Sequence, residues 1–223
     1  TAYEITYGDW SSDVCSSDLQ DIRFAAFIMT YERPAEVMAH VRMLLDGQPK
    51  PEKVLIIDNS ESQLTQDLFC SSDLMNIEYI RMGFNSGPAG AAWLGLCKLA
   101  EQGFNWIYWG DDDDPPEFGD EFGRLLQLAT ATDCLDVGIL GVVGHRFNRA
   151  SGEMVRTADD ELLSGALLDV ESVAGNQCML VNAALIRKGI LPDPDLFFGF
   201  EELDFCLRVR QAGVRIVVPA DLF

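Results

Sequence analysis

The chain has 223 residues, of which 48% are hydrophobic and 10% aromatic, enough apolar material for one domain with a substantial core. This composition excludes a disordered chain, and no apolar run approaches the roughly 18 residues that a membrane span needs. The net charge of −20 repels phosphate backbones, so we expect no nucleic-acid partner.

The pentapeptide Cys-Ser-Ser-Asp-Leu occurs twice in identical form, at 15–19 and again at 70–74. Solenoid repeats are longer and degenerate, so this pair does not indicate a repeat architecture. Each copy interrupts an otherwise patterned chain, and we interpret both as translated sequencing-adapter sequence. We therefore expect residues 1–20 and 70–74 to be non-native and assign them no function.

The segment Thr1–Trp10 lacks the basic region and the apolar core of a signal peptide. The six cysteines contain no CxxC pair, which is typical of reduced thiols in a cytosolic protein. We expect a cytoplasmic protein, which in its full-length form could associate peripherally with the inner face of the membrane. The chain stops at Phe223 directly after an apolar stretch, so we expect a C-terminal truncation.

From residue 22 onward, strand-like and helix-like segments alternate along the chain. Strands are predicted at 22–29, 54–57, 77–80, 106–109 and 137–143. Helices are predicted from Pro34 to Gly47, over 63–69, from Gly90 to Gln102 and over 117–130. This alternation predicts an α/β fold with an open, mostly parallel sheet and helices on both faces.

The second half of the chain is less regular. Residues 144–172 show little periodicity, a strand is predicted near 175–181, and a short helix follows it to Gly189. An amphipathic helix is predicted over 200–211, with Gly213 as its cap. Ligands of open parallel sheets bind beyond the carboxyl ends of the strands. We therefore expect the polar clusters that follow the first four strands to meet at one edge.

Four adjacent carboxylates, Asp111 to Asp114, follow the strand predicted at 106–109. These charges repel one another, and a hard divalent cation with oxygen ligands would stabilise them. Asp111 and Asp113, spaced i and i+2, could reach one ion that neutralises a diphosphate leaving group. The alternative interpretation is a solvated acidic loop in which an aspartate caps the next helix.

Two weaker features are predicted at the same edge. Asp58 follows the second strand, where it either forms a turn or accepts hydrogen bonds from a base or ribose. Asn85, Gly87 and Gly90 precede a helix, and glycines in such a place let backbone N–H groups approach an anionic ligand. Gly-Pro turns are common, so this second feature is a weak indication by itself.

A second acidic motif, Glu201-Glu202-x-Asp204, follows an aromatic stretch late in the chain. Acidic residues in a first helical turn suit the helix dipole, and Asp204 forms an ordinary i, i+4 pair with Arg208. That explanation accounts less well for the two glutamates. One of them could act as a general base toward a hydroxyl group.

Taken together, these segments resemble the family 2 glycosyltransferases, which have the GT-A fold. The resemblance covers nearly all of residues 21–223 and rests on five motifs in the family's order. They are Thr30-Tyr31-Glu32-Arg33-Pro34, Asp58-Asn59-Ser60, Asn85-x-Gly87-x-x-Gly90, Asp111-Asp112-Asp113 and Glu201-Glu202-x-Asp204-x-x-x-Arg208. Within the family, the sequence looks most similar to the rhamnosyl- and galactofuranosyl-transferase-like enzymes of cell-surface polysaccharide biosynthesis.

The resemblance implies a single catalytic domain over 21–223, with a Rossmann-like nucleotide-sugar half at 21–116 and an acceptor half at 117–223. It implies an inverting transfer from a UDP- or dTDP-sugar to a hydroxyl of a glycan or lipid-linked acceptor, assisted by Mn²⁺ or Mg²⁺. The implied nucleotide contacts are Thr30, Arg33, Asp58, Asn85, Gly87, Gly90 and Asp112, and the implied metal ligands are Asp111 and Asp113. The implied base is Glu202, with Glu201 beside it, and the implied sugar or acceptor contacts are Trp109, Gln177 and Asp204.

Three positions depart from the family's pattern. Glu32 replaces the usual Asn, Asp114 leaves the register of the metal pair open by one residue, and Glu202 replaces the commoner Asp. Two other functions remain open. A sugar-nucleotide-forming nucleotidyltransferase would need a Gly-rich, basic loop after the first strand, where Arg33 is the one basic residue. A non-catalytic nucleotide- or glycan-binding module would bind the donor without transferring its sugar.

Overall fold

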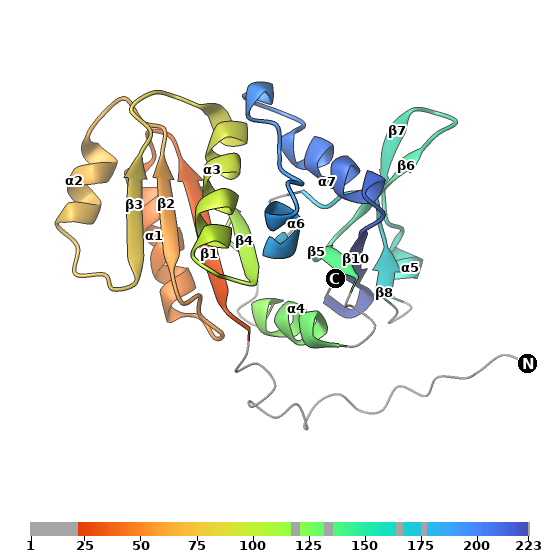
Figure 1. Ribbon diagram of the computed structural model, residues 1–223. Helices are drawn as coiled ribbons and strands as arrows, with labels where there is room; N and C mark the ends of the chain where they lie inside the picture. Colours follow the sequence, from red (N-terminus) through yellow and green to blue (C-terminus); the bar gives the residue numbers. More distant parts are fainter. Residues whose placement is uncertain (1–21, 117–120, 132–135, 164–166, 175–177, 223) are drawn as a thin grey trace, which may run out of the picture.

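The computed structural model describes residues 22–116, 121–131, 136–163, 167–174 and 178–222. They form an eight-stranded sheet in the order β3-β2-β1-β4-β9-β5-β10-β8, and a separate hairpin of β6 and β7 projects from one end (Figure 1). The strands are β1 (Phe24–Thr30), β2 (Val54–Asp58), β3 (Ile77–Arg81), β4 (Trp106–Asp111), β5 (Val137–Leu140), β6 (His145–Asn148), β7 (Glu153–Arg156), β8 (Leu167–Asp169), β9 (Leu180–Asn182) and β10 (Arg215–Pro219). The helices are α1 (Pro34–Asp46), α2 (Leu64–Cys70), α3 (Gly87–Glu101), α4 (Glu121–Thr130), α5 (Asp159–Leu162), α6 (Ala183–Arg187) and α7 (Glu201–Gln211), with 3-10 turns η3 (Pro194–Leu196) and η4 (Ala220–Leu222).

Most strands of the large sheet run in one direction. β1 is parallel to β2 and β4, and β2 is parallel to β3. β9 is antiparallel to both β4 and β5, so β4 and β5 point the same way, and β10 is parallel to β5. The reversed strands of this sheet are therefore β9 and β8, which confirms the predicted α/β fold with a mostly parallel sheet.

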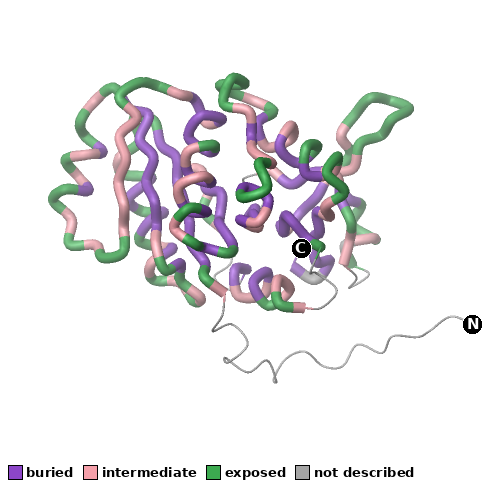
Figure 2. Tube along the Cα trace, in the orientation of Figure 1, coloured by how far each residue is buried: buried purple, intermediate pink, exposed green. Residues whose placement is uncertain are grey.

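Helices cover both faces of the sheet, because its central strands are apolar on both sides. β1, β2 and almost all of β4 are buried along their whole length (Figure 2). One face packs against the apolar sides of α1 and α4, through residues such as Val41 and Leu125. The other face packs against α3, α6 and α7, with Phe205 of α7 fully buried. Strands that are buried on both faces read as continuous apolar runs, which is why the sequence located them.

The structure differs from the sequence-based prediction in several segments, and β9, for example, is confined to Leu180–Asn182. β4 extends to Asp111, so the first aspartate belongs to the strand and not to the loop after it. β5 ends at Leu140, earlier than predicted. The segment 144–172, whose sequence shows little periodicity, contains β6, β7, α5 and β8. The two hairpin strands are largely exposed, so they lack the hydrophobic periodicity from which strands are recognised.

Two expectations concern the ends and interruptions of the chain. Residues 1–20 lie outside the described residues, whereas 70–74 form the end of α2 and the connection to β3. The non-native origin of both segments stays a prediction. Within the described part of the chain, no helix has the length and apolar character to cross a membrane.

Candidate functional site

The strands end in register at one edge of the sheet, and the polar clusters follow them there. Thr30 of β1 pairs with Asp58 of β2, which in turn pairs with Arg81 of β3. On the other side of β1, Met29 pairs with Asp111 of β4. The loops after β1, β2 and β4 therefore begin side by side, at the edge where ligands of open α/β sheets bind.

Asp112 ties the loop after β4 to the loop after β1. Its side chain is 7% exposed and accepts hydrogen bonds from Thr30 Oγ1 at 2.7 Å and from the backbone N–H of Tyr31 at 3.4 Å. Its other oxygen lies 3.1 Å from Arg33 Nη1. Burial raises the pKa of this carboxyl, and the bonds from Thr30 and Arg33 act in the opposite direction. Asp112 therefore serves as an internal connection between two loops.

Asp111 lies on the other side of the same backbone. Successive residues of a strand point to opposite faces, so Asp111 shares a face with Trp109. The ring centroid of Trp109 lies 6.0 Å from that of Phe205 on α7. Burial raises the pKa of Asp111 to about 7, and the charges of Glu202, Asp113, Asp112 and Glu201 add to the effect. Asp111 at the end of β4 is thus near enough to Glu201 and Glu202 of α7 for their charges to affect its pKa.

Glu201 and Glu202 begin α7, the helix that packs on this face of the sheet. The chain enters the helix through Gly199 and Phe200, both in the left-handed region of φ. Glu201 is 6% exposed, and its Oε2 has no hydrogen-bond partner among the described residues. The positive end of a helix dipole favours negative charge in the first turn. A buried carboxylate oxygen without a donor is nevertheless costly.

The residue types of the aspartate carboxylates suit a divalent cation, but their side chains are not arranged around a common point. Asp111 and Asp113 supply oxygen ligands at i, i+2 spacing, and Mn²⁺ or Mg²⁺ prefers such ligands. The raised pKa of Asp111 and the unpartnered oxygen of Glu201 show repulsion and missing hydrogen bonds that a cation would relieve. Across the described ranges, however, no three His, Cys, Asp or Glu side chains are arranged to hold a metal. Asp113 instead meets the guanidinium of Arg33.

Asp58 is completely buried at the end of β2. One carboxylate oxygen accepts the backbone N–H of Ser60 at 2.8 Å, and the other accepts the hydroxyl of Tyr79. Burial, and next the bond to Asp58, raise the pKa of Tyr79. Both oxygens of Asp58 therefore have partners within the chain, and any contact with a nucleotide would have to share or replace them.

Glu32, the departure from the usual Asn, joins two loops beside this edge. One oxygen of its carboxylate accepts the backbone N–H groups of Glu61 and Ser62, each at 2.8 Å, and the other accepts the Ser62 hydroxyl. These bonds lower the pKa of Glu32. The loop after β1 is thereby attached to the loop after β2, and the longer Glu side chain provides the reach.

The glycine motif before α3 receives part of the chain itself. Gly87 has φ +68°, and a Cβ at this position would lie 2.0 Å from the carbonyl oxygen of Phe197. That carbonyl accepts the N–H of Ala89 at 3.2 Å, and the side chain of Asn85 accepts the N–H of Gly87 at 2.9 Å. The close backbone approach predicted for a ligand is thus made here by the segment that leads into α7. Contacts of Asn85, Gly87 and Gly90 with a nucleotide stay a prediction.

The predicted sugar and acceptor contacts are Trp109, Asp204 and Gln177. Trp109 has no exposed surface and packs between Phe27 and Phe205 in the core, and its contact with the sugar stays a prediction. Asp204 is bonded to Arg208 at 2.5 Å, the ordinary i, i+4 pair considered from the sequence. Gln177 lies outside the described residues.

The structure adds residues that we did not select from the sequence. His40 is buried under the aspartate turn, which we define as Asp111–Asp114, and its Nδ1 lies 2.7 Å from the carbonyl oxygen of Asp111. Asn59 accepts from the N–H and the hydroxyl of Ser86, which connects the loop after β2 to the start of α3. The sequence could have indicated that His40 is buried, because it lies three residues after Val37 on the buried side of α1. Asn59 gave no signal beyond turn chemistry.

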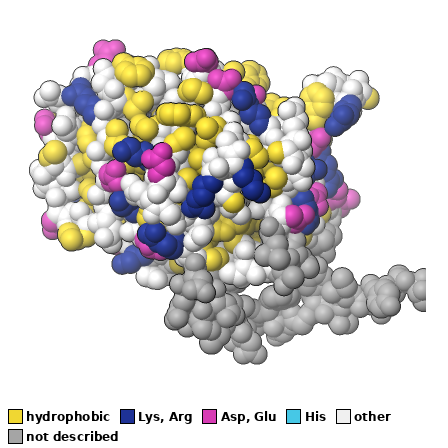
Figure 3. Space-filling model, in the orientation of Figure 1, with side chains coloured by type: hydrophobic (Ala, Val, Ile, Leu, Met, Phe, Trp, Pro, Cys, Tyr) yellow, Lys and Arg dark blue, Asp and Glu magenta, His cyan; other side chains and the backbone are white. Residues whose placement is uncertain are grey.

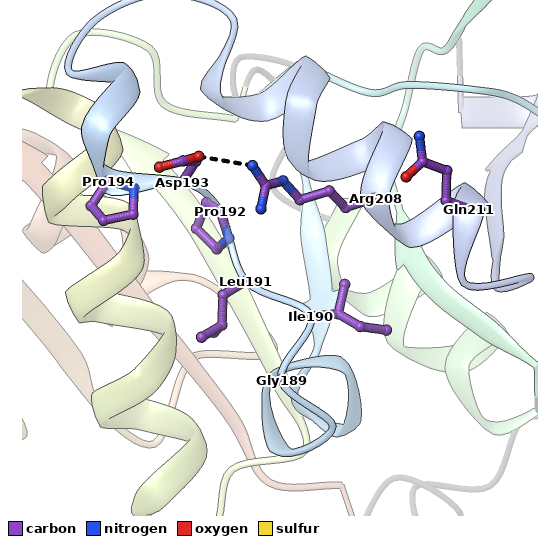
Figure 4. A pocket seen from close by; sticks show the side chains of 8 residues that line it. All are labelled: Gly189, Ile190, Leu191, Pro192, Asp193, Pro194, Arg208 and Gln211. Atoms are coloured by element: carbon purple, nitrogen blue, oxygen red, sulfur yellow. Dashed lines mark hydrogen bonds and ion pairs between the residues drawn. The ribbon is translucent and has the colours of Figure 1, made fainter.

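The surface has an apolar area and a hollow. Apolar side chains gather on the upper middle of the face in Figure 3, over α3 and the segment around η3. Large exposed side chains of the two loops there include Phe84, Phe198 and Phe200, which are 64%, 78% and 75% exposed. A hollow of about 420 Å³ lies between the loop 189–194 and α7, crossed by the ion pair of Asp193 with Arg208 (Figure 4). None of the predicted site residues lines this hollow.

Comparison with known proteins gives matches in structure and none in sequence. No protein-family model matches the chain, and no curated protein matches it. The structure of GalNAc-T7 with UDP, GalNAc and Mn²⁺ is similar over 89% of this chain and 42% of that one, with 13% identity and a TM-score of 0.69. The structure of residues 1–349 of TarS from S. aureus is similar over 90% of this chain and 58% of that one, with 17% identity and a TM-score of 0.62. The structure of the mannosyltransferase PcManGT from Pyrobaculum calidifontis, in complex with GDP-Man and Mn²⁺, is similar over 90% of this chain and 55% of that one. The identity is 13% and the TM-score is 0.64.

At these identities the comparison establishes the fold. The chain has the fold of GT-A-type glycosyltransferases, as the sequence predicts. It spans about half the length of the structures to which it is similar.

Proposed function

We propose that this chain is the catalytic domain of a glycosyltransferase that takes its sugar from a nucleotide-diphosphate donor with the help of a divalent cation. One observation carries the proposal. At the ligand-binding edge of a GT-A-type fold, Asp111 of the aspartate turn is near enough to the paired glutamates of α7, far from it in the sequence, for their charges to affect its pKa. Structures with this fold include complexes with UDP and GDP-Man, each together with Mn²⁺.

Each part of the edge takes a role in the proposed reaction. Asp111 and Asp113 would hold Mn²⁺ or Mg²⁺, which would neutralise the leaving diphosphate. Thr30, Arg33 and Asp58 would hold the base, ribose and phosphates, together with Asp112 and the residues before α3. The carboxylates by themselves repel a diphosphate, so the donor needs a cation here, consistent with the net charge of −20.

Glu202 is proposed as the general base, as the family resemblance implies. The acceptor oxygen forms the new bond to the anomeric carbon while the bond to the leaving nucleoside diphosphate breaks, and the hydroxyl proton passes to the Glu202 carboxylate. A single displacement of this kind inverts the anomeric carbon. Glu201 is more buried, and we assign it the positioning of the site beside Glu202.

The acceptor is proposed to be a hydroxyl of a glycan or of a lipid-linked glycan. The exposed rings of Phe198 and Phe200 directly precede Glu201 and give the acceptor side an apolar surface. Aromatic side chains contribute large contact areas in ligand sites. A UDP- or dTDP-linked donor and a rhamnosyl- or galactofuranosyl-transferase-like activity are the subtypes that the sequence motifs favour.

The proposal is tested by calorimetry with UDP, dTDP and GDP, in Mn²⁺ and in EDTA. We expect binding that depends on Mn²⁺ and falls about tenfold or more in Asp113→Asn, a loss of about 1.4 kcal/mol or more. Asp160→Asn, on the exposed surface of α5, removes the same charge outside the predicted site and should change the affinity little. Nucleotide binding that is equally tight in EDTA and unaffected by Asp113→Asn would contradict the proposal.

The catalytic assignment needs a second measurement. In Glu202→Gln we expect donor binding to persist while hydrolysis or transfer of the sugar falls by two to four orders of magnitude, the usual contribution of a general base, about 10²–10⁴. Donor binding by the unmodified protein without any turnover would favour the non-catalytic binding module. Formation of a sugar nucleotide from a sugar phosphate and a nucleoside triphosphate would favour the nucleotidyltransferase.

A further inference from the structure

One guanidinium group spans two carboxylates of the aspartate turn. Arg33 Nη1 lies 3.1 Å from Asp112 Oδ1, and the same nitrogen donates a shorter hydrogen bond to Asp113 Oδ2. Arg33 is the N-cap residue of α1, in the loop after β1. A cation from one loop is therefore bound to the acidic turn of another loop, at one of the two predicted metal ligands.

The two aspartates differ in how firmly they are held. Asp112 is buried and, besides its contact with Arg33, accepts hydrogen bonds from Thr30 and Tyr31. Asp113 has 53% of its side chain exposed, and Arg33 has 48%. Loss of the guanidinium would thus leave Asp112 in place and release Asp113 to turn elsewhere.

We propose that Arg33 competes with the divalent cation for Asp113, and that the displaced guanidinium then pairs with the diphosphate of the donor. This inference rests on the proposed function and assigns one residue two successive partners. In the protein without metal, Arg33 neutralises Asp113. When the metal takes Asp113, the guanidinium loses that partner and can turn its N–H groups to a phosphate, which a guanidinium can bind in a bidentate manner.

The proposed exchange couples the two ligands thermodynamically. A metal that binds alone must break the contact of Arg33 with Asp113, and nothing replaces that contact. A metal that binds together with a nucleoside diphosphate gives the guanidinium a new partner. Each ligand should therefore raise the affinity for the other by the same factor, and part of this factor should depend on Arg33.

The test compares the affinity for Mn²⁺ in the unmodified chain, in Arg33→Gln and in Arg23→Gln, each measured by calorimetry with and without UDP. Arg23 is a matched control, because its side chain is also 48% exposed and pairs with Glu52 at 3.1 Å, at the opposite end of β1. We expect Arg33→Gln to bind Mn²⁺ alone about fivefold more tightly, equivalent to about 1 kcal/mol. Arg23→Gln should stay within about twofold of the unmodified chain.

The second expected result is a weaker coupling between the binding of Mn²⁺ and the binding of UDP in Arg33→Gln. In the unmodified chain UDP should raise the affinity for Mn²⁺, and in Arg33→Gln this factor should fall about fivefold. If Arg33→Gln binds Mn²⁺ alone no more tightly than the unmodified chain, the competition is refuted, even where Mn²⁺ and UDP bind as the proposed function requires. If the unmodified chain binds no Mn²⁺ with or without UDP, dTDP or GDP, the proposed function fails and this inference fails with it.

A structure of the unmodified chain with Mn²⁺ and UDP provides a test that does not depend on the folding of a variant. We expect Arg33 to have left Asp113 and to contact a phosphate oxygen, while Asp112 keeps its bonds to Thr30 and Tyr31. An Arg33 guanidinium that stays on Asp113 beside the bound metal would overturn the inference.

Discussion

Asp111 and Asp112 are neighbours in the chain, yet their surroundings give them different chemistry. Asp112 points toward the loop after β1 and is held by Thr30 and Tyr31. Asp111 points toward α7, where burial and the neighbouring carboxylates raise its pKa to about 7. The alternation of side chains along β4 produces this difference. Asp111 and Asp113 as the metal pair stay a prediction, since Asp113 also has a partner within the chain, Arg33.

The imidazole of His40 supports the backbone of the same turn. With Nδ1 bonded to the carbonyl of Asp111 and Nε2 buried without a partner among the described residues, the neutral form is favoured. Burial lowers the pKa of His40 to about 4, and the bond to Asp111 opposes that shift only in part. A neutral histidine in this position is the form that the fold requires.

This pKa predicts how stability depends on pH. Because the folded-state pKa is below the unfolded value of about 6.5, the unfolded chain binds the proton more strongly between these values. The contribution of His40 is complete above that range and is lost as the pH falls through it, by about 2 kcal/mol at pH 5. Between pH 7 and pH 5, the stability difference between the unmodified protein and His40→Gln should shrink by about this amount in urea unfolding.

A paired comparison isolates the effect of His40. Asp111 titrates with the opposite sign, since its raised pKa makes the folded state bind the extra proton, but it is present in both proteins of the comparison. His145 is only partly buried, and His145→Gln should show a smaller change. A stability difference for His40→Gln that is constant across this pH range would contradict the assignment.

At the scale of elements, the junction of α3 with the segment before α7 joins the two halves of the chain. The carbonyl of Phe197 approaches the backbone of Gly87 and accepts a hydrogen bond from Ala89. Phe197 and Phe200 both have positive φ, a conformation that is unfavourable for phenylalanine and is kept where the surroundings impose it. The strained turn delivers Glu201 and Glu202 to the edge where the aspartate turn lies.

Gly87→Ala is predicted to destabilise this junction strongly. The new methyl group would meet the Phe197 carbonyl at 2.0 Å, so backbone must move, and the positive φ adds further strain. We expect a loss of about 3 kcal/mol or more in unfolding free energy, measured by denaturant titration. Gly83→Ala is the control, because Gly83 also has positive φ but nothing lies within 4 Å of its Cβ position. It should cost about 1 kcal/mol, and equal losses for both variants would count against the proposed packing.

At the scale of the whole molecule, charge is the dominant property. A net charge of −20 on 223 residues produces repulsion that opposes the compact state. The ion pairs among the described residues are mostly at least partly exposed, as with Arg23 and Glu52, and such pairs contribute little each. Dissolved salt, which screens the repulsion between the negative charges, should therefore stabilise the folded protein.

Thermal unfolding should reveal this effect. Raising NaCl from about 20 mM to about 300 mM shortens the Debye length from about 20 Å to about 6 Å, and we expect the midpoint to rise by a few degrees. Repeating the series with KCl in EDTA separates general screening from binding of a cation at the aspartate turn. A midpoint that falls steadily over this range would show that attractive pairs outweigh the net repulsion.

Much of the fold followed from local patterns in the sequence. β1, β2 and β4 are buried on both faces, and their apolar runs located them to within a few residues. The exposed hairpin of β6 and β7 was missed for the opposite reason, since it buries too little to impose a periodicity. The sequence also predicted that the polar clusters after β1, β2 and β4 begin at one edge, and the strand register shows this, because parallel strands end on the same side of a sheet.

The sequence by itself thus determined the α/β class, the residue types at the ligand-binding edge and the motifs that suggest a glycosyltransferase. Only the tertiary structure decided that β9 is inserted antiparallel between β4 and β5, that Trp109 belongs to the core, and that Glu201 and Glu202 are near enough to Asp111 to affect its pKa. The physical reason is the distance along the chain over which each kind of interaction acts. Periodicity and turn chemistry act between residues close in the chain, whereas these contacts join distant segments and depend on the packing free energy of the whole domain.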